Sequence, residues 1–391
     1  PMLLERATTA MHFQRPRDMT QCYGSCAKSA ELTGMSSALH DWDPSASLEK
    51  VRSGLWAWMK SQNPAGFEEH ALALFRWQAS QNEVYKAFVD ALSVDPNRVK
   101  HVVDIPCMPV EFFKTHTIKT GDWEAASVFR SSGTSQTANR AQHHLDDHGP
   151  RWYAAVAGWG WESQWKKPVD AWSWLGLLPG YLGREDASLL HMVSDFMTLA
   201  DGSDQGMLMH DHDALMLALS KWADQKTRRP LVLFGVTWAV LDWVEALRSE
   251  SSWIETIPWN EVTLVDTGGM KGRSIEPIRS EVQGAIREVL PEIGLASEYG
   301  MTEMMSQGYA LDGIHQRFPV WVKPIVREAR DPRAEARKDK VGRLDVIDLA
   351  NVHSCAFLAT QDVAKITDQG LVLLGRQDNA EVRGCSLLAA P

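Results

Sequence analysis

Short apolar runs alternate with amphipathic stretches through the middle of this 391-residue chain. Four of these runs are bounded by turn residues and predict buried strands, at residues 128–129, 175–178, 231–234 and 262–265. Between them, apolar residues recur at helical spacing in residues 213–223 and 239–248. Because strands and helices alternate, the pattern predicts an α/β protein with a largely parallel central sheet.

The pattern differs at both ends of the chain. Residues 1 to about 45 show no periodicity and predict an irregular arm. Helices are expected next, because Leu72, Phe75 and Ala79 lie at helical spacing. Near the other end, apolar runs joined by Asp, Asn and Gly turns predict a small β-rich subdomain. Its expected strands are residues 344–347, 355–358 and 371–374.

Composition and charge narrow the class of protein. Forty basic and fifty acidic residues give a formal charge of −10, which argues against a nucleic-acid partner. The basic residues within 327–340 are therefore expected to lie on a solvated loop. The longest apolar stretch, residues 231–241, is shorter than the ~20 residues that span a bilayer, so no membrane span is expected.

The expected location is the cytoplasm. No basic and apolar leader opens the chain. The cysteines are odd in number and scattered, which favours reduced thiols over a disulfide framework. They are Cys22, Cys26, Cys107, Cys355 and Cys385.

Seventeen tryptophans are unusual for this length, and several cluster within residues 152–174. Trp152, Val156 and Trp159 share one helical face, which favours an aromatic core. The alternative is an apolar pocket wall for an acyl or aryl group.

Two polar segments carry the candidate chemistry. Residues 131–136, Ser-Ser-Gly-Thr-Ser-Gln, form a hydroxyl-rich turn after a predicted strand, where backbone N–H groups and hydroxyls can donate to phosphate. Residues 297–303, Ser-Glu-Tyr-Gly-Met-Thr-Glu, combine an aromatic ring, a glycine turn, a hydroxyl and a carboxylate. These are the groups that a nucleotide, its α-phosphate and Mg²⁺ need. The phosphate loop of nucleoside triphosphatases and the Rossmann fingerprint are both missing from the sequence.

Three further segments make a family resemblance specific. Residues 266–273 precede the Tyr-Gly-Met-Thr-Glu segment, and residues 360–362 and 375–378 follow it. This order resembles the adenylate-forming superfamily of acyl-CoA synthetases, adenylation domains and luciferases. Within that superfamily, residues 105–114, 268–273, 298–307 and 383–388 resemble the LuxE-type acyl-protein synthetases, the fatty-acid-activating subunits of bacterial fatty-acid reductase complexes. The similarity runs from about Ile105 to the C-terminus.

The resemblance implies a set of nucleotide contacts. The phosphate loop would hold the β- and γ-phosphates of ATP through Ser131, Ser132, Gly133, Thr134 and Ser135. Thr302 would contact the α-phosphate, and Glu303 would bind Mg²⁺. The adenine would be bordered by Gly268, Gly269, Met270, Tyr299 and the turn at Gly300. Asp362 would accept hydrogen bonds from both ribose hydroxyls, reinforced by Arg376.

The chain also departs from the family pattern. Ser135 and Gln136 stand where most relatives carry a Thr-Gly pair, and Arg140 is the first cation that follows. The residues after Arg376 are too few for the usual lid domain with its catalytic lysine, since a domain needs ~50 residues or more. Lys271 and Arg273 are the nearest candidates to replace that lysine.

The resemblance places the acyl acceptor near the C-terminus. Cys385 matches the cysteine that takes the acyl group in the acyl-protein synthetases. A thiolate is a good acyl acceptor, and Arg383 would lower the pKa of this thiol.

Two histidine-rich segments are weaker candidates. Residues 210–213, His-Asp-His-Asp, are interpreted as a polar turn or helix cap in preference to a metal site. His143, His144 and His148 lie near the phosphate loop, and nothing selects which of them would contact a substrate carboxylate.

The function expected from the resemblance is ATP-dependent activation of a carboxylic acid, fatty or aryl, to acyl-AMP with release of pyrophosphate. The acyl group would pass to Cys385 and on to a partner such as an acyl reductase. One alternative is a ligase that acylates an external amine, CoA or carrier-protein thiol; another is a non-catalytic acyl-binding subunit. The expected cofactors are ATP and Mg²⁺.

The expected fold is an α/β adenylate-forming core of mixed sheets flanked by helices, with the C-terminal lid missing or truncated. Its expected parts are an N-terminal arm with helices (1–100), the core (101–340), a β-rich subdomain (341–376) and a short tail (377–391).

Overall fold

The computed structural model describes residues 45–132, 140–178, 184, 186–200, 206–207, 211–248, 255–268, 279–329, 331 and 333–376. All of them belong to the unit Asp41–Pro391. The predicted arm, apart from Ser45, lies outside these residues, as does the predicted tail. The division into four parts proposed from the sequence stays a prediction.

Three of the four strands predicted in the middle of the chain lie in one sheet, in the order β5-β4-β6-β7-β8-β9, whereas the predicted strand at residues 128–129 pairs elsewhere, with β3 (Gln142–Leu145). Its strands are β4 (Ser173–Leu177), β5 (Gly206–Met207), β6 (Leu231–Gly235), β7 (Val262–Asp266), β8 (Gly294–Tyr299) and β9 (Gly308–Ala310). The first five pair in parallel, and β9 is antiparallel to β8. All five residues of β4 and of β6 are buried, as expected for parallel strands covered on both faces. The predicted parallel sheet is confirmed.

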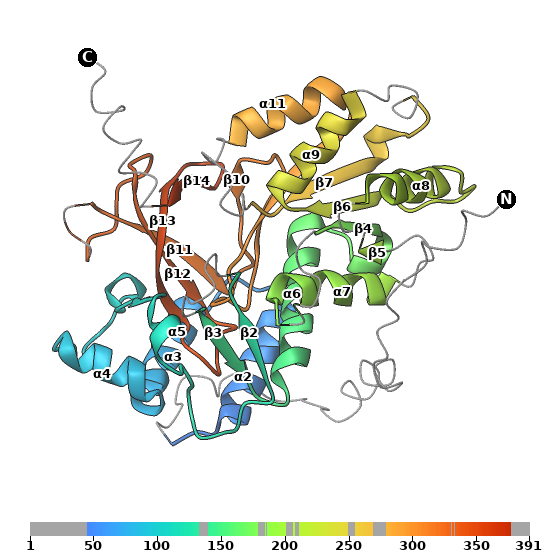
Figure 1. Ribbon diagram of the computed structural model, residues 1–391. Helices are drawn as coiled ribbons and strands as arrows, with labels where there is room; N and C mark the ends of the chain where they lie inside the picture. The colour runs from blue at the N-terminus through green and yellow to red at the C-terminus, as the bar shows by residue number, and fades with distance from the viewer. Residues whose placement is uncertain are drawn as a thin grey trace, which may run out of the picture. The chain divides into compact units, whose positions relative to one another are not determined.

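Helices cover both faces of this sheet, with α9 and α11 side by side on one face and α6 and α7 on the other (Figure 1). Their bounds, with that of α8, are α6 (Gly149–Trp165), α7 (Ser188–Ala200), α8 (His212–Ala223), α9 (Thr237–Arg248) and α11 (Arg279–Val289). In α9 the buried residues Ala239, Val240, Trp243, Val244 and Leu247 form one apolar stripe. The two predicted helices of this region, α8 and α9, are confirmed.

A second sheet contains the predicted β-rich segment, in the order β10-β14-β13-β12-β11. Its strands are β10 (His315–Gln316), β11 (Val322–Arg327), β12 (Gly342–Asp348), β13 (Phe357–Ile366) and β14 (Leu371–Arg376). A short strand from far earlier in the chain, β1 (Met108–Pro109), adds in parallel to β13. β13 begins two residues later than predicted and runs on to Ile366, so Thr360 and Asp362 lie within the strand.

The N-terminal helices pack beside this second sheet. They are α2 (Leu48–Ser61), α3 (Phe67–Gln81) and α4 (Glu83–Ala91), and a single turn, α5 (Phe112–Thr115), follows β1. Gln78 of α3 is fully buried, and its Nε2 donates to the carbonyl oxygens of Asn351, Val352 and Ser354. Its Oε1 accepts from the backbone N–H of Ala356. One amide side chain therefore satisfies four backbone groups of the loop that precedes β13.

A two-stranded sheet carries the predicted phosphate loop, with β2 (Ser127–Arg130) antiparallel to β3 (Gln142–Leu145). Three short 3₁₀ turns complete the described elements, at Val102–Asp104, Val169–Ala171 and Trp259–Glu261.

The tryptophan cluster lies in the core. Trp152, Trp161 and Trp174 are at most 1% exposed. The Trp161 ring stacks on Trp165 with centroids 4.3 Å apart and meets Trp174 at 4.7 Å. The favoured interpretation as an aromatic core is confirmed for these residues.

The basic segment 327–340 was expected to be a solvated loop, and its first residue is an exception. Arg327 is 3% exposed, and its Nε donates to Asp345 Oδ2 at 2.7 Å. Its Nη1 donates to the carbonyl oxygens of Val103 and Arg333. The expectation was wrong at this residue because Arg327 closes β11, whose inward positions are buried by neighbouring elements.

Within the described residues, no helix has the length and apolar character needed to cross a membrane.

Replacing Arg327 with Met tests the buried ion pair. The Asp345 carboxylate would keep only the half-exposed Arg343 as a cationic neighbour, at 3.5 Å, so the free energy of unfolding should fall by about 3 kcal/mol. Urea denaturation measures it. Adding Asp345→Asn to Arg327→Met should recover part of the loss, because no uncompensated charge remains. A single-variant loss below about 1 kcal/mol would show that the pair contributes no more than a surface pair.

Candidate active site

The candidate site forms where parallel strands β7 and β8 end. Their last residues, Asp266 and Tyr299, are followed by the Gly268 and Gly300 turns that the sequence predicted. In open α/β sheets, ligands bind at the carboxyl ends of the strands, because the loops there supply polar groups. Gly268 has φ +76°, and nothing lies within 4 Å of where a Cβ would stand. Its N–H donates to Asp266 Oδ1 at 3.0 Å, so the turn is held open by the preceding carboxylate.

Three predicted nucleotide residues from three motifs meet at this edge. The Tyr299 hydroxyl donates to Asp362 Oδ2 at 2.7 Å. Asp362 of β13 and Arg376 of β14 are opposite each other in the antiparallel register, and Arg376 Nε lies 3.5 Å from Asp362 Oδ1. One carboxylate oxygen thus faces the tyrosine and the other the arginine. Tyr299, Asp362 and Arg376 therefore form one cluster, although Asp362 and Arg376 follow Tyr299 by 63 and 77 positions in the sequence.

Glu303 belongs to the same electrostatic cluster. Its side chain is 8% exposed, and burial raises its pKa to about 7. The positive charges of Arg376 and Lys114 oppose that rise, and Asp362 adds to it. A carboxylate with so high a pKa gains from a nearby cation, because the cation favours its charged form.

The backbone of the Thr302–Glu303 turn is fixed from two sides. His143 of β3 donates from Nδ1 to the Thr302 carbonyl at 2.8 Å. Asn351 donates from Nδ2 to the Glu303 carbonyl at 2.7 Å. Because both carbonyls are held, the two side chains project from a fixed turn.

His143 is the histidine of the β2–β3 region with a defined partner. It is fully buried, and burial lowers its pKa to about 4, so it is neutral near pH 7. Its ring stacks on His353 with centroids 5.3 Å apart. His143 therefore positions the turn through its hydrogen bond, while His148 is exposed at the start of α6.

The base of the phosphate loop is cationic. Ser131 Oγ accepts from the Ala141 N–H at 3.0 Å, and its carbonyl accepts from Arg140 Nε at 2.6 Å. Asp186 is approached by Arg140 at 2.8 Å, Arg184 at 3.5 Å and Arg130 at 3.9 Å. Three guanidinium groups around one carboxylate leave a net positive charge beside Ser131 and Ser132, as an anion site requires.

Several predicted site residues lie outside the described residues. They are Gly133, Thr134, Ser135, Gln136, Gly269, Met270, Lys271, Arg273, Arg383 and Cys385. Their predicted roles stay predictions. Among residues 210–213, His210 is likewise outside, and Asp211 caps α8 by accepting from the Ala214 N–H at 2.8 Å. The interpretation of this segment as a helix cap holds for Asp211.

The sequence interpretation assigned no role to Glu298, although it lies within a quoted motif. Glu298 is 6% exposed, burial raises its pKa to about 8, and a Cβ on Gly300 would stand 2.5 Å from its Oε1. The glycine is therefore needed beside this carboxylate. The available signal was an acidic residue on an otherwise apolar strand, one position before Tyr299.

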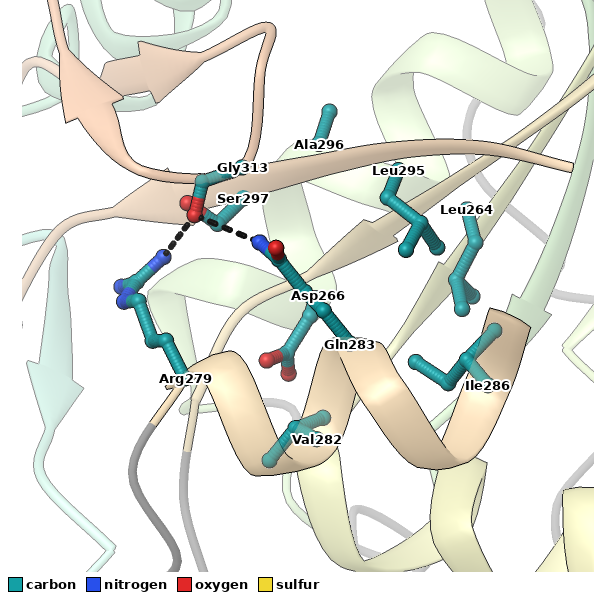
Figure 2. A pocket seen from close by; sticks show the side chains of 10 residues that line it. All are labelled: Leu264, Asp266, Arg279, Val282, Gln283, Ile286, Leu295, Ala296, Ser297 and Gly313. Carbon is teal, nitrogen blue, oxygen red and sulfur yellow. Dashed lines mark hydrogen bonds between the residues drawn. The ribbon is translucent and has the colours of Figure 1, made fainter. Parts of the chain in front are cut away.

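Arg279 was also missed. It begins α11 and, with Gln283, donates to the Gly313 carbonyl, at 3.3 and 3.0 Å (Figure 2). These two residues rim a hollow between α11 and strands β7 and β8, whose apolar floor includes Leu264, Ile286 and Leu295. The positive charge of Arg279 acts on both Asp266 and Glu298. The strand ends thus carry acidic groups faced by one arginine.

The donor set fits ATP and one Mg²⁺. No group of three His, Cys, Asp or Glu that could hold a metal by itself occurs in the described part of the chain. Mg²⁺ usually binds through one or two carboxylates together with substrate phosphates. The buried carboxylate of Glu303, with the positive charges of Arg376 and Lys114 acting on it, matches that requirement.

Comparison with known proteins confirms the resemblance expected from the motifs. The family model described as "Acyl-protein synthetase, LuxE" matches residues 51–144. The matched segment starts upstream of Ile105, where the motif resemblance began, includes α5 and β2, and ends within β3, before the later motifs. The comparison with curated proteins gave no match.

Solved structures resemble the chain in fold. A 2-hydroxyisobutyryl-CoA ligase in an open conformation, in complex with 2-HIB-AMP and CoA, aligns with a TM-score of 0.58 at 12% identity, over 88% of this chain and 76% of the ligase chain. The same ligase in the thioesterification state gives 0.56 at 13% identity, over 87% and 74%. The chain therefore shares its α/β fold with this ligase.

Replacing Tyr299 with Phe tests the central hydrogen bond of the cluster. Loss of the hydroxyl leaves Asp362 without its neutral donor, so the free energy of unfolding should fall by about 1.5–3 kcal/mol. Guanidinium denaturation of both proteins measures the difference. A loss within about 0.5 kcal/mol of zero would mean that the bond to Asp362 does not stabilise the fold.

Proposed function

We propose that this chain activates a carboxylic acid with MgATP, forming an acyl-AMP and releasing pyrophosphate. The observation that carries the proposal is the meeting of Tyr299, Asp362, Arg376 and Glu303 at one edge of the fold. The family model over residues 51–144 and the adenylate-forming fold support it.

In the proposed reaction, a carboxylate oxygen of the acid attacks the α-phosphorus of ATP. The bond between that phosphorus and the bridging oxygen breaks, and pyrophosphate leaves with the electron pair. Asp362 would accept from the ribose hydroxyls, and Tyr299 would border the adenine while holding the Asp362 carboxylate in place. Mg²⁺ on Glu303 would neutralise phosphate charge.

The arginine cluster would serve the leaving group. Arg130, Arg140 and Arg184 surround Asp186 directly beside Ser131. Pyrophosphate carries more negative charge as a leaving group than as part of ATP, so a cationic loop base favours its departure.

Glu303→Gln should lower acid-dependent pyrophosphate exchange at least tenfold, ~1.4 kcal/mol in the barrier. The pH dependence gives a second readout. The folded pKa of Glu303 is raised to about 7, so below that pH Mg²⁺ must displace a proton. The affinity of wild-type protein for MgATP should therefore rise with pH up to about 7 and then level, whereas Glu303→Gln should show no such rise.

Nucleotide titration between pH 6 and pH 8 measures this, and Glu292→Gln, an exposed glutamate outside the site, is the matched control. Exchange by Glu303→Gln at the wild-type rate would remove Glu303 from the metal site.

The acyl group is proposed to pass next to Cys385, within the Arg-Gly-Cys-Ser segment that resembles the acyl-protein synthetases, and from there to a partner such as an acyl reductase. The two cysteines in the described residues are poor acceptors. Burial raises the pKa of both the Cys107 and Cys355 thiols, which disfavours the nucleophilic thiolate.

Cys385→Ser should still form acyl-AMP but should lose the hydroxylamine-labile acyl label, because a hydroxyl without a base is a much weaker nucleophile than a thiolate. Intact-protein mass spectrometry after incubation with acid and MgATP measures the label, and Cys107→Ser is the control. An acyl mass retained in Cys385→Ser would reject self-acylation at this residue.

Two other functions give different outcomes in the same assays. A ligase that acylates an external amine, CoA or carrier-protein thiol would release pyrophosphate without labelling itself. A non-catalytic acyl-binding subunit would bind the acid and release no pyrophosphate. A panel of acids from short aliphatic through aryl to long-chain, scored by pyrophosphate release, identifies the substrate class.

A further inference from the structure

Adenylation needs a cation between its two reacting anions. The substrate carboxylate and the α-phosphate repel each other, and the transition state adds charge at the phosphorus. Among the cations near Glu303, Arg376 is already paired with Asp362. The two cations that the sequence nominated, Lys271 and Arg273, lie outside the described residues.

Lys114 lies on α5, which is docked against the candidate site from two directions. Its neighbour Phe113 is buried, with its ring 5.9 Å from that of His143, the residue that holds the Thr302 carbonyl. On the other side, Glu111 Oε1 accepts from Gln361 Nε2 at 2.5 Å, one residue before Asp362. The α5 turn is thus tied to the Thr302 turn and to the ribose-binding strand at once.

The ammonium group of Lys114 forms no ion pair with a described residue. Lys114 is exposed, and the described residues offer it neither a hydrogen bond nor an ion pair. The nearby Lys119, by contrast, donates to the Trp123 carbonyl and lies over the Trp123 ring. The charge of Lys114 nevertheless acts on the buried Glu303 carboxylate, alongside that of Arg376. Lys114 therefore combines a backbone position fixed by the neighbours of α5 with an exposed ammonium group whose charge acts on Glu303.

We propose that Lys114 is a catalytic residue of adenylation, whose ammonium group contacts the substrate carboxylate and an α-phosphate oxygen as they approach. The inference rests on the proposed function and assigns to it a residue that no motif role had claimed. The new carboxyl–phosphorus bond forms as the bond to pyrophosphate breaks, and no proton is transferred to or from the lysine.

The test compares Lys114→Met, Lys114→Arg and the control Lys60→Met, an exposed lysine at the end of α2. Lys114→Met removes the charge and keeps the length of the side chain. Loss of one charged donor from a transition state costs on the order of 100-fold in rate. Acid-dependent pyrophosphate exchange should fall by about that factor in Lys114→Met, with AMP affinity unchanged, and Lys114→Arg should recover at least about tenfold.

Each outcome separates the inference from the proposed function. Wild-type protein without any acid-dependent exchange would overturn the proposed function. An active wild type with Lys114→Met within about threefold of it would overturn the role of Lys114 alone. A Lys114→Met protein that loses AMP binding as strongly as exchange would also overturn it, since that pattern indicates a structural role. Reduced exchange with intact AMP binding, recovered by Lys114→Arg and absent from Lys60→Met, supports it.

Discussion

The candidate site depends on one fully buried carboxylate, Asp348, at the end of β12. Its Oδ2 accepts from the N–H groups of Met305 and Ser306, both at 2.9 Å. Its Oδ1 accepts from Ser306 Oγ at 2.7 Å and from the Ala350 N–H at 3.1 Å. Four donors satisfy an ion that burial would otherwise strongly disfavour, as its raised pKa reflects. The segment after Glu303 is thereby fixed to the second sheet, which is why residues from two sheets can form one site.

The two neighbouring glutamates contrast with Asp348. Glu298 and Glu303 are also buried, yet no donor comparable to those of Asp348 holds their carboxylates within the described residues, and burial raises their pKa values to about 8 and about 7. A folded-state pKa above the unfolded value near 4.5 means that stability falls as pH rises through the window between the two. Ionising either group lowers the free energy of unfolding, and a bound cation would raise it again by stabilising the charged carboxylate. Strongly raised carboxylate pKa values of this kind are frequent at functional sites.

The sequence predicted the elements better than the contacts between them. Apolar runs such as 231–234 are sufficient to predict β6, because a parallel strand covered on both faces needs apolar side chains throughout. The contact between Tyr299 and Asp362 was implied only by resemblance, since no local pattern reports which strands meet across two sheets. Arg327 was misassigned for a related reason: a charged residue in a basic segment looks solvated until its buried partner Asp345 is known. Tertiary partners decide the position of charged residues, and they are distant in sequence.

The same limit explains why Lys114 and Glu298 were overlooked. Each is ordinary in its local sequence, a lysine after two phenylalanines and a glutamate before a tyrosine. Their significance comes from their surroundings: the Glu298 carboxylate is buried under the charge of Arg279, and the Lys114 ammonium is exposed with no ion pair among the described residues. Glu303 is buried, and the positive charges of Arg376 and Lys114 act on its carboxylate. In the proposed function, a negatively charged nucleotide would pair with the Lys114 ammonium, and its metal ion would pair with the Glu303 carboxylate.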